Sequence, residues 1–161
     1  MLTCTFPRKR RDTRRQGPAG VPARPLIDIG TALDLLAAAV ADRGGSFVYP
    51  PVPDPDRTCL FRMNDGPGCL VAHALSMAGV DVDELAPLRH DSIRELYRQD
   101  RLPVRLTLGA LVVLAAAERS EDHGCTWGAA LGRATDAAAR FVDLLPVREL
   151  VRDRHPVVIG P

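Results

Sequence analysis

The segment Asn64–Gly79 contains the residues whose types and spacing come closest to a catalytic pair. Cys69 lies at the predicted start of a helix, where free backbone amides and the helix dipole favour a thiolate. His73 follows one turn later and Ser76 three residues after that, so the three share one stripe of the helix. A thiol beside an imidazole can act as nucleophile and base, which makes Cys69 and His73 candidate catalytic residues.

A structural role explains the same stripe. Cysteine is common in protein cores, and the stripe can pack under the segment Phe47–Arg62. Papain-like enzymes also place a cysteine at a helix start, but their histidine arrives on a strand, whereas the chain after Cys69 is predicted to be helical nearly throughout. No evident group orients His73 or binds an oxyanion, so packing is the expectation and catalysis the alternative.

A second set of side chains could bind zinc, because thiolates and imidazoles are the ligands of tetrahedral zinc sites. The candidate metal ligands are Cys59, Cys69, His73, His123 and Cys125. The chain has no C-x-x-C motif, so we expect no cofactor and keep zinc as an alternative. His123 also has a structural explanation, since an imidazole near a helix C-terminus interacts favourably with the dipole.

An acidic cluster ends one of the predicted helices. It contains Glu118, Glu121 and Asp122, with Asp65 as a further candidate. Paired carboxylates can bind Mg²⁺ or act in acid–base catalysis. Such clusters are more often solvated helix ends, which is the expectation here. The chain has no phosphate-binding glycine loop and no H-E-x-x-H or G-x-S-x-G motif.

The N-terminal region differs from the rest in charge. Residues 1–24 carry a net charge of +6, and residues 25–161 carry −5. Residues 1–25 combine bases with proline and glycine and offer nothing to bury, which predicts a disordered basic arm. Its cations could bind nucleic-acid phosphates, but a solvated tail is expected because no aromatics are interleaved with them. The candidate nucleic-acid residues are Arg8, Lys9, Arg10, Arg11, Arg14 and Arg15.

The hydrophobic pattern predicts the elements that position these residues. Leu108–Ala117 contains no polar side chain, and Thr107 is a suitable N-cap, so Leu106–Asp122 is predicted to be a helix buried on all sides. This apolar run is too short to span a bilayer, which needs about 20 residues. An apolar stripe over Trp127–Leu145 predicts a long helix that Pro146 ends, antiparallel to the buried one.

The remaining elements are shorter. Helices are predicted over Thr31–Arg43 and Pro67–Ala78, with short turns at Asp83–Leu88 and from an Asp91 cap through Tyr97 or Gln99. Phe47–Tyr49 and Cys59–Arg62 are predicted to pair as a hairpin. The predicted fold is therefore a mainly α, single-domain helical bundle over residues 26–161. It has a small two-stranded β-hairpin between its first and second helices, and residues 146–161 form a peripheral tail.

Two segments, Gly66–Leu75 and Asp122–Leu131, resemble small uncharacterised proteins of actinobacteria and their phages, over roughly Thr31–Leu145. The resemblance implies one compact domain in a bacterial or phage cytoplasm, and it transfers no functional residue. No apolar run follows the N-terminal bases, so no signal peptide is recognised, and reduced thiols and no membrane contact are expected.

These patterns favour a non-enzymatic binding or regulatory module with an unknown protein partner. One alternative is a small cysteine-dependent hydrolase or transferase that uses Cys69 and His73. Another is a zinc-stabilised nucleic-acid-binding domain with the basic N-terminal arm.

Overall fold

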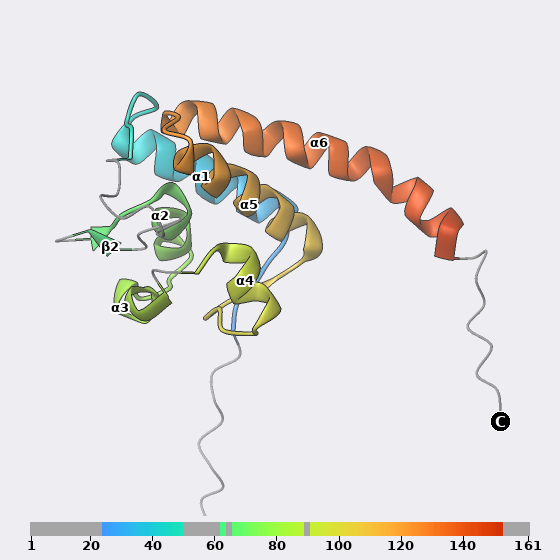
Figure 1. Cartoon of the computed structure of the whole chain (residues 1–161), viewed down its shortest axis with the longest axis horizontal. Coiled ribbons are helices and arrows are strands. Elements are labelled where there is room, and N and C mark those ends of the chain that lie inside the picture. The colour runs from blue at the N-terminus through green and yellow to red at the C-terminus, as the bar shows by residue number, and fades with distance from the viewer. Residues whose placement is uncertain (1–23, 50–61, 64–65, 89–90, 153–161) are drawn as a thin grey trace, which may run out of the picture.

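The computed structural model describes residues 24–49, 62–63, 66–88 and 91–152, and most of these are helical (Figure 1). The helices are α1 (Ile29–Arg43), α2 (Leu70–Met77), α3 (Val82–Leu85), α4 (Ile93–Arg98), α5 (Leu108–Asp122) and α6 (Trp127–Arg152), and a 3₁₀ turn, Ala86–Leu88, follows α3. The strands are β1 (Leu26–Ile27), β2 (Arg62–Met63), β3 (Gly66–Pro67) and β4 (Arg105–Leu106). The predicted mainly α fold class is confirmed.

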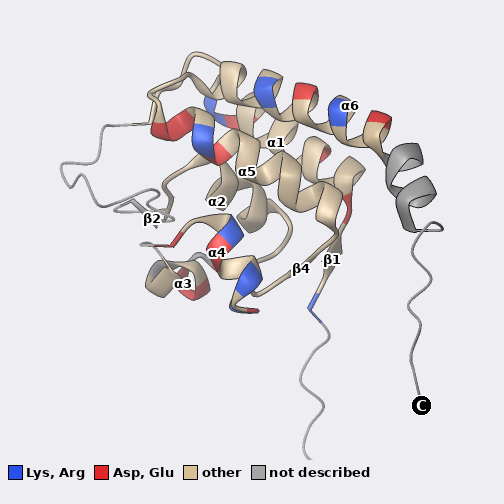
Figure 2. Ribbon diagram, turned by 45° about the vertical axis from the view of Figure 1, so that its right-hand side comes forward, with Lys and Arg blue, Asp and Glu red and all other residues tan. Residues whose placement is uncertain are grey.

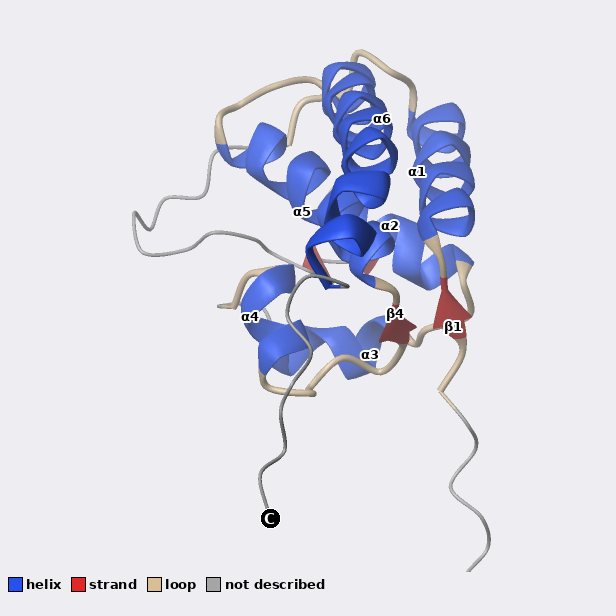
Figure 3. Cartoon of the chain, turned by 90° about the vertical axis from the view of Figure 1, so that its right-hand side faces the viewer, coloured by secondary structure: helices blue, strands red, loops and turns tan. Residues whose placement is uncertain are grey.

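Helix α5 lies at the centre of the packing. It contacts α1, α2, α4 and α6, and the end-on view in Figure 3 shows α1, α5 and α6 around the top of the molecule with α4 below. The Thr107 hydroxyl accepts the Ala110 amide at 3.2 Å and caps its first turn. Leu114 is 1% exposed, whereas Leu108 in the first turn is 48% exposed. The expectation of burial on all sides is therefore wrong at the N-terminal end of α5.

Helices α5 and α6 form the predicted antiparallel hairpin (Figure 1). Gly124 makes the turn with φ 74°, a left-handed conformation that glycine adopts without strain. The Thr126 hydroxyl then accepts the Ala129 amide at 3.2 Å. The face of α6 that packs on the core consists largely of alanine after Trp127, and these small side chains let the helices approach closely. Its buried members are Trp127, Ala130, Ala134 and Ala138.

The predicted end of α6 at Pro146 is wrong, because the helix continues to Arg152. A proline removes its own N–H and crowds the carbonyl one turn before it, which disfavours a helix without always ending one. That carbonyl belongs to Val142, whose residue is exposed, so water can replace the lost donor. Residues 146–152 of the predicted peripheral tail therefore extend α6 past the other helices (Figure 1).

The strand pairing differs from the prediction. Val48 forms an isolated bridge to Thr126, and Arg62–Met63 pairs antiparallel with Gly66–Pro67. A tight hairpin does lie between α1 and α2, but its second strand is the segment that we expected to begin the helix. Closing a connection of two residues costs less chain entropy than closing the longer predicted loop. Residues 50–61, which include most of Cys59–Arg62, lie outside the described residues.

A second pair of strands has no counterpart in the prediction. Strands β1 and β4 run parallel, with Leu26 opposite Arg105 and Ile27 opposite Leu106 (Figure 3). Strand β1 directly precedes α1 and β4 directly precedes α5, so this pairing sets the two helix starts side by side. Two-residue strands carry no periodicity, which is why the sequence pattern could not predict them.

Two helix starts also differ. Helix α2 begins at Leu70 with Cys69 as its N-cap, rather than at Pro67, which lies in β3. Helix α4 is capped by Ser92, whose hydroxyl accepts the Glu95 amide at 3.3 Å, rather than by Asp91. The basic arm, apart from Arg24 and Pro25, lies outside the described residues.

Candidate functional site

Cys69 is fixed at the junction of β3 and α2. Its backbone is extended, with φ −94° and ψ 165°, and its Sγ accepts the Ala72 amide at 3.4 Å. The residue is only 1% exposed. The thiol therefore acts as a helix N-cap in a site that solvent does not reach in this conformation.

His73 lies one turn further along α2 and is also buried. Its Nε2 is 2.9 Å from the Oδ2 atom of Asp42, which α1 holds on the surface. The other ring nitrogen, Nδ1, is buried with no hydrogen-bond partner among the described residues. The Trp127 ring lies against the imidazole, with ring centroids 5.6 Å apart. Asp42 thus orients His73, a role that the sequence could not reveal because 31 positions separate the two residues.

A third side chain at this junction is Glu121 of α5, which is 5% exposed. Its Oε1 accepts the Leu70 amide at 2.9 Å, so a carboxyl group from another helix covers the N-terminus of α2. Burial raises the pKa of Glu121 to about 7 and the repulsion from Asp122 adds to this rise, whereas the hydrogen bond from the Leu70 amide and the nearby Trp127 indole lower the pKa.

Backbone amides at the start of α2 therefore already donate hydrogen bonds within the protein. Those of Leu70 and Ala72 bond to Glu121 and Cys69. The Glu121 carboxyl group at the same helix start occupies the place where an oxyanion would bind, and in its ionised form it also repels a thiolate. This arrangement opposes nucleophilic chemistry at Cys69, although Asp42 and His73 resemble the orienter and base of a catalytic triad.

Glu118 repeats the capping arrangement at a second helix. It is 4% exposed, and the Ile93 amide at the start of α4 donates to its Oε1 at 3.0 Å and its Oε2 at 3.1 Å. Burial raises the pKa of Glu118 to about 8. Repulsion from Asp122 and Glu121 adds to the rise, whereas the Ile93 amide and the charge of Arg94 lower the pKa.

The expectation of a solvated acidic helix end is wrong for Glu118 and Glu121. The sequence did contain a signal for Glu121, because it continues the buried stripe of Ala110, Leu114 and Ala117 at spacings of four and three. Asp122 is exposed and fits the expectation, although partial burial raises its pKa to about 6 and the nearby His123 acts in the opposite direction.

The candidate metal ligands fall into separate places. Cys69 and His73 lie on α2, His123 and Cys125 lie at the turn between α5 and α6, and Cys59 is outside the described residues. Over the described ranges, no three or more histidine, cysteine, aspartate or glutamate side chains are grouped so that they could hold a metal ion. The candidate nucleic-acid residues Arg8–Arg15 also lie outside these ranges.

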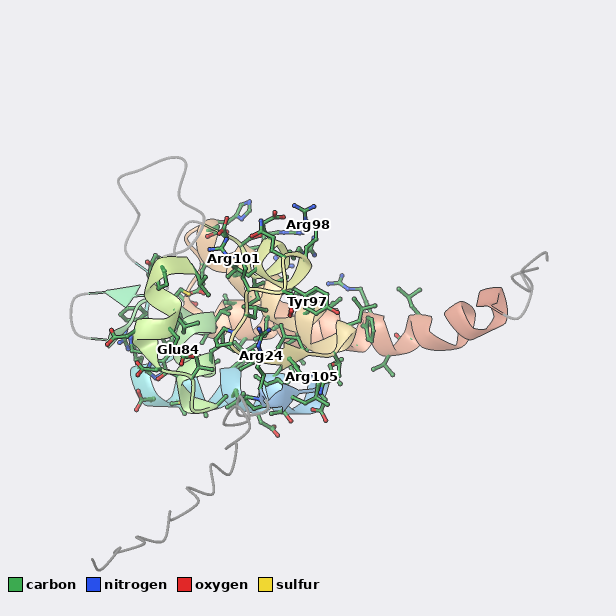
Figure 4. The ribbon with its side chains drawn as sticks, turned by 90° about the horizontal axis from the view of Figure 1, so that it is seen from below. Arg24, Glu84, Tyr97, Arg98, Arg101 and Arg105 are labelled. Atoms are coloured by element: carbon green, nitrogen blue, oxygen red, sulfur yellow. The ribbon has the colours of Figure 1, made fainter. Side chains whose placement is uncertain are left out.

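The described residues line hollows on two parts of the surface. The strand-side hollow, of about 440 Å³, is lined by Tyr97, Arg98, Asp100, Leu102, Val104, Arg105 and Leu106. Figure 4, seen from below, shows Tyr97 between Arg98 and Arg105 on this face. Its charges are largely paired: Asp100 bonds to Arg24 at 2.9 Å, and Arg98 bonds to Glu95.

The α5–α6 hollow, of about 370 Å³, lies along the helical hairpin. It is lined by Ala116, Arg119, Ser120, His123, Cys125, Arg133 and Arg140. No acidic residue is in this set. Sequence reasoning missed it because its cations come from two helices and lie up to 21 positions apart, from Arg119 to Arg140.

Comparisons with protein-family models, with curated proteins and with solved structures gave no match. The resemblance to small actinobacterial and phage proteins therefore stays a prediction. Among the described helices, none has both the length and the hydrophobicity that crossing a bilayer requires.

Proposed function

We propose that this protein is a non-enzymatic binding or regulatory module. The observation that carries the proposal is the structural use of Cys69 and His73, the pair best suited to catalysis. The thiol caps α2 in a buried site, and the imidazole pairs with Asp42 beside the Trp127 ring. A side chain that supports folding in this way is not positioned for turnover, so the proposed activity lies in binding at the surface.

Exposed apolar side chains at one end of the molecule support a protein partner. This apolar end consists of Leu26, Leu108, Val142 and Leu144, each about half exposed. A Cβ atom on Gly109 would lie 3.1 Å from Ile29 and from Phe141, so α1, α5 and α6 meet closely there. Apolar side chains that gather on a surface are typical of protein-binding sites.

A small cysteine-dependent hydrolase or transferase is the second candidate. The Asp42–His73 contact favours it, because a carboxylate that fixes an imidazole is the usual support for a catalytic base. A zinc-stabilised nucleic-acid-binding domain is the third candidate. It depends on the basic arm, since residues 25–161 carry a net charge of −5 that would repel nucleic acid.

Alkylation of cysteines separates the first two candidates. The native protein is treated with iodoacetamide between pH 6.5 and pH 8, and the modified cysteines are located by peptide mass mapping. Cys125, which is half-buried in the α5–α6 hollow, serves as the internal reference. We expect Cys125 to react first and Cys69 to react only after denaturation, in the parent and in His73→Ala alike.

The opposite pattern would reject the proposal. If Cys69 is labelled in the folded protein below pH 8 and His73→Ala slows that labelling, the thiol is accessible and activated by the imidazole. The cysteine-dependent enzyme would then become the leading function.

A further inference from the structure

We infer that the α5–α6 hollow is a binding site for a small organic phosphate. The inference rests on the proposed binding function and adds the chemical class of a ligand. Three guanidinium groups and one imidazole line a single concave site, and its polar lining is otherwise limited to Ser120 and Cys125. Guanidinium groups recognise phosphate oxygens with paired, charge-assisted hydrogen bonds.

The helix geometry explains why these side chains converge. Arg133 and Arg140 are seven residues apart on α6, so they share one face two turns apart. Arginine side chains on a helix lean toward its N-terminus, so both lean toward the turn that joins α5 and α6. Arg119 lies in the last turn of α5, and His123, one turn later, is the C-cap of that helix, which runs antiparallel alongside α6. The cations thus approach one space from two sides.

Among the residues that the structure describes, these cations are not engaged in ion pairs. In the described part of the chain, no carboxylate lies within ion-pair distance of Arg119, Arg133 or Arg140. Red and blue segments alternate along α6 in Figure 2, and Asp136 lies between the two α6 arginines, but it does not line the hollow. The strand-side hollow differs, because the carboxylate of Asp100 is part of its lining and Glu95 already pairs with Arg98.

His123 is held at the edge of the hollow by a contact within its own turn. Its Nδ1 is 2.6 Å from the carbonyl oxygen of Arg119, and a carbonyl can only accept, so Nδ1 carries a proton. This contact fixes the imidazole among the residues that line the hollow. Ala116 and Cys125 add apolar surface beside the cations, which suits a phosphate that bears an organic group.

The setting favours a small ligand over a nucleic-acid strand. A strand-binding surface needs a continuous track of cations, whereas here the cations are confined to one hollow of about 370 Å³. Residues 25–161 carry a net charge of −5, and Asp136 and Asp143 flank the arginines on α6. A long polyanion would meet these charges, but a ligand contained in the hollow would not.

Isothermal titration calorimetry on the full chain at low salt tests the inference. The probes are adenosine 5′-monophosphate, pyrophosphate and citrate, with a single-stranded oligonucleotide for comparison. We expect one site for the nucleotide and for pyrophosphate, with weaker binding of citrate and of the oligonucleotide. Arg133→Gln and Arg140→Gln should each weaken nucleotide binding about tenfold, the usual effect of losing one charge-assisted contact.

Arg105→Gln is the matched control, because it removes the same charge from the strand-side hollow and should leave the affinity unchanged. The inference is overturned if neither phosphate binds, if Arg133→Gln and Arg140→Gln bind as the parent does, or if citrate or the oligonucleotide binds more tightly than the nucleotide. If neither phosphate binds, only the proposed phosphate site is rejected. Labelling of Cys69 in the folded protein would instead reject the proposed non-enzymatic function, so the two failures are distinguishable.

Discussion

Cys69 is an unusual N-cap at the scale of a single residue, because a thiol accepts hydrogen bonds more weakly than a hydroxyl. Its burial against β3 and α2 explains the choice, since sulfur loses less than oxygen when it leaves water. The same burial separates a structural cysteine from a reactive one, which sequence alone could not do. A cysteine at a helix start is equally compatible with both roles until its exposure is known.

Substitution of Cys69 tests the capping role. Cys69→Ser keeps an acceptor for the Ala72 amide, so its free energy of unfolding should stay within about 1 kcal/mol of the parent. Cys69→Ala loses the acceptor and leaves a small void, and it should cost about 1–2 kcal/mol. Urea denaturation followed by circular dichroism measures both variants. An alanine variant as stable as the parent would show that the Sγ contact contributes nothing.

At the scale of the elements, the close approach of α6 to the loop after α1 depends on glycine. The Gly128 amide donates to the Gly45 carbonyl at 2.8 Å, and the Trp127 amide donates to Phe47 at 2.8 Å. A Cβ atom on Gly128 would lie 2.9 Å from that same Gly45 oxygen. The contact is between two backbones, so neither partner can move aside as a flexible side chain could.

Two glycine substitutions in α6 should have opposite effects. Gly128→Ala should lower the free energy of unfolding by about 1–3 kcal/mol, because it forces the backbones apart. Gly132→Ala is the control: its Cβ would meet nothing within 4 Å, and alanine is favoured over glycine inside a helix, so a gain of about 0.5–1 kcal/mol is expected. Equal melting temperatures for the two variants would mean that the Gly128–Gly45 approach does not constrain α6.

The elements also show what sequence patterns can and cannot predict. The apolar run of α5 and the stripe of α6 predicted a helical hairpin, because long periodic segments carry their own signal. Strands β1 and β4 and the role of Asp42 were not predicted, since each depends on contacts between residues far apart in the chain. Pro146 misled the prediction, because a proline weakens a helix locally and leaves the rest of it intact.

The same limit applies to the candidate site. Cys69 and His73 could be found from their types and spacing, and their packing in a buried site was the expectation, but their neighbours Glu121, Asp42 and Trp127 could not be predicted. Glu118 and Glu121 lie after the apolar run and among other charges, so the sequence predicted that their side chains would be exposed to solvent. In the structure both side chains are buried instead, because the starts of α2 and α4 lie against them.

At the scale of the whole molecule, α5 organises the fold with its two buried carboxyl groups. Glu121 covers the start of α2 and Glu118 covers the start of α4, so a single helix fixes the positions of two others. The helix N-termini favour the ionised carboxylates, whereas burial favours the neutral acids. Burial dominates, since the pKa of Glu118 rises to about 8 and that of Glu121 to about 7.

This arrangement makes stability depend on pH. Between the unfolded value of 4.5 and the raised folded values, the native state binds more protons than the unfolded state. The contribution of these two groups to stability is therefore complete below about pH 4.5 and is lost as the pH rises through 7 and 8. Asp122, with its pKa raised to about 6, acts in the same direction.

The measurement that tests this account most directly is the free energy of unfolding between pH 5 and pH 8.5, in the parent and in Glu118→Gln. The amide keeps an acceptor for Ile93 and cannot ionise. We predict that the parent loses on the order of 3 kcal/mol over this range, and that Glu118→Gln loses clearly less and is at least as stable at pH 8.5. Glu84→Gln, on the exposed face of α3, should follow the parent. A parent whose stability is constant or increases over this range, or a Glu118→Gln variant with the parent's full pH dependence, would contradict the buried-carboxyl account.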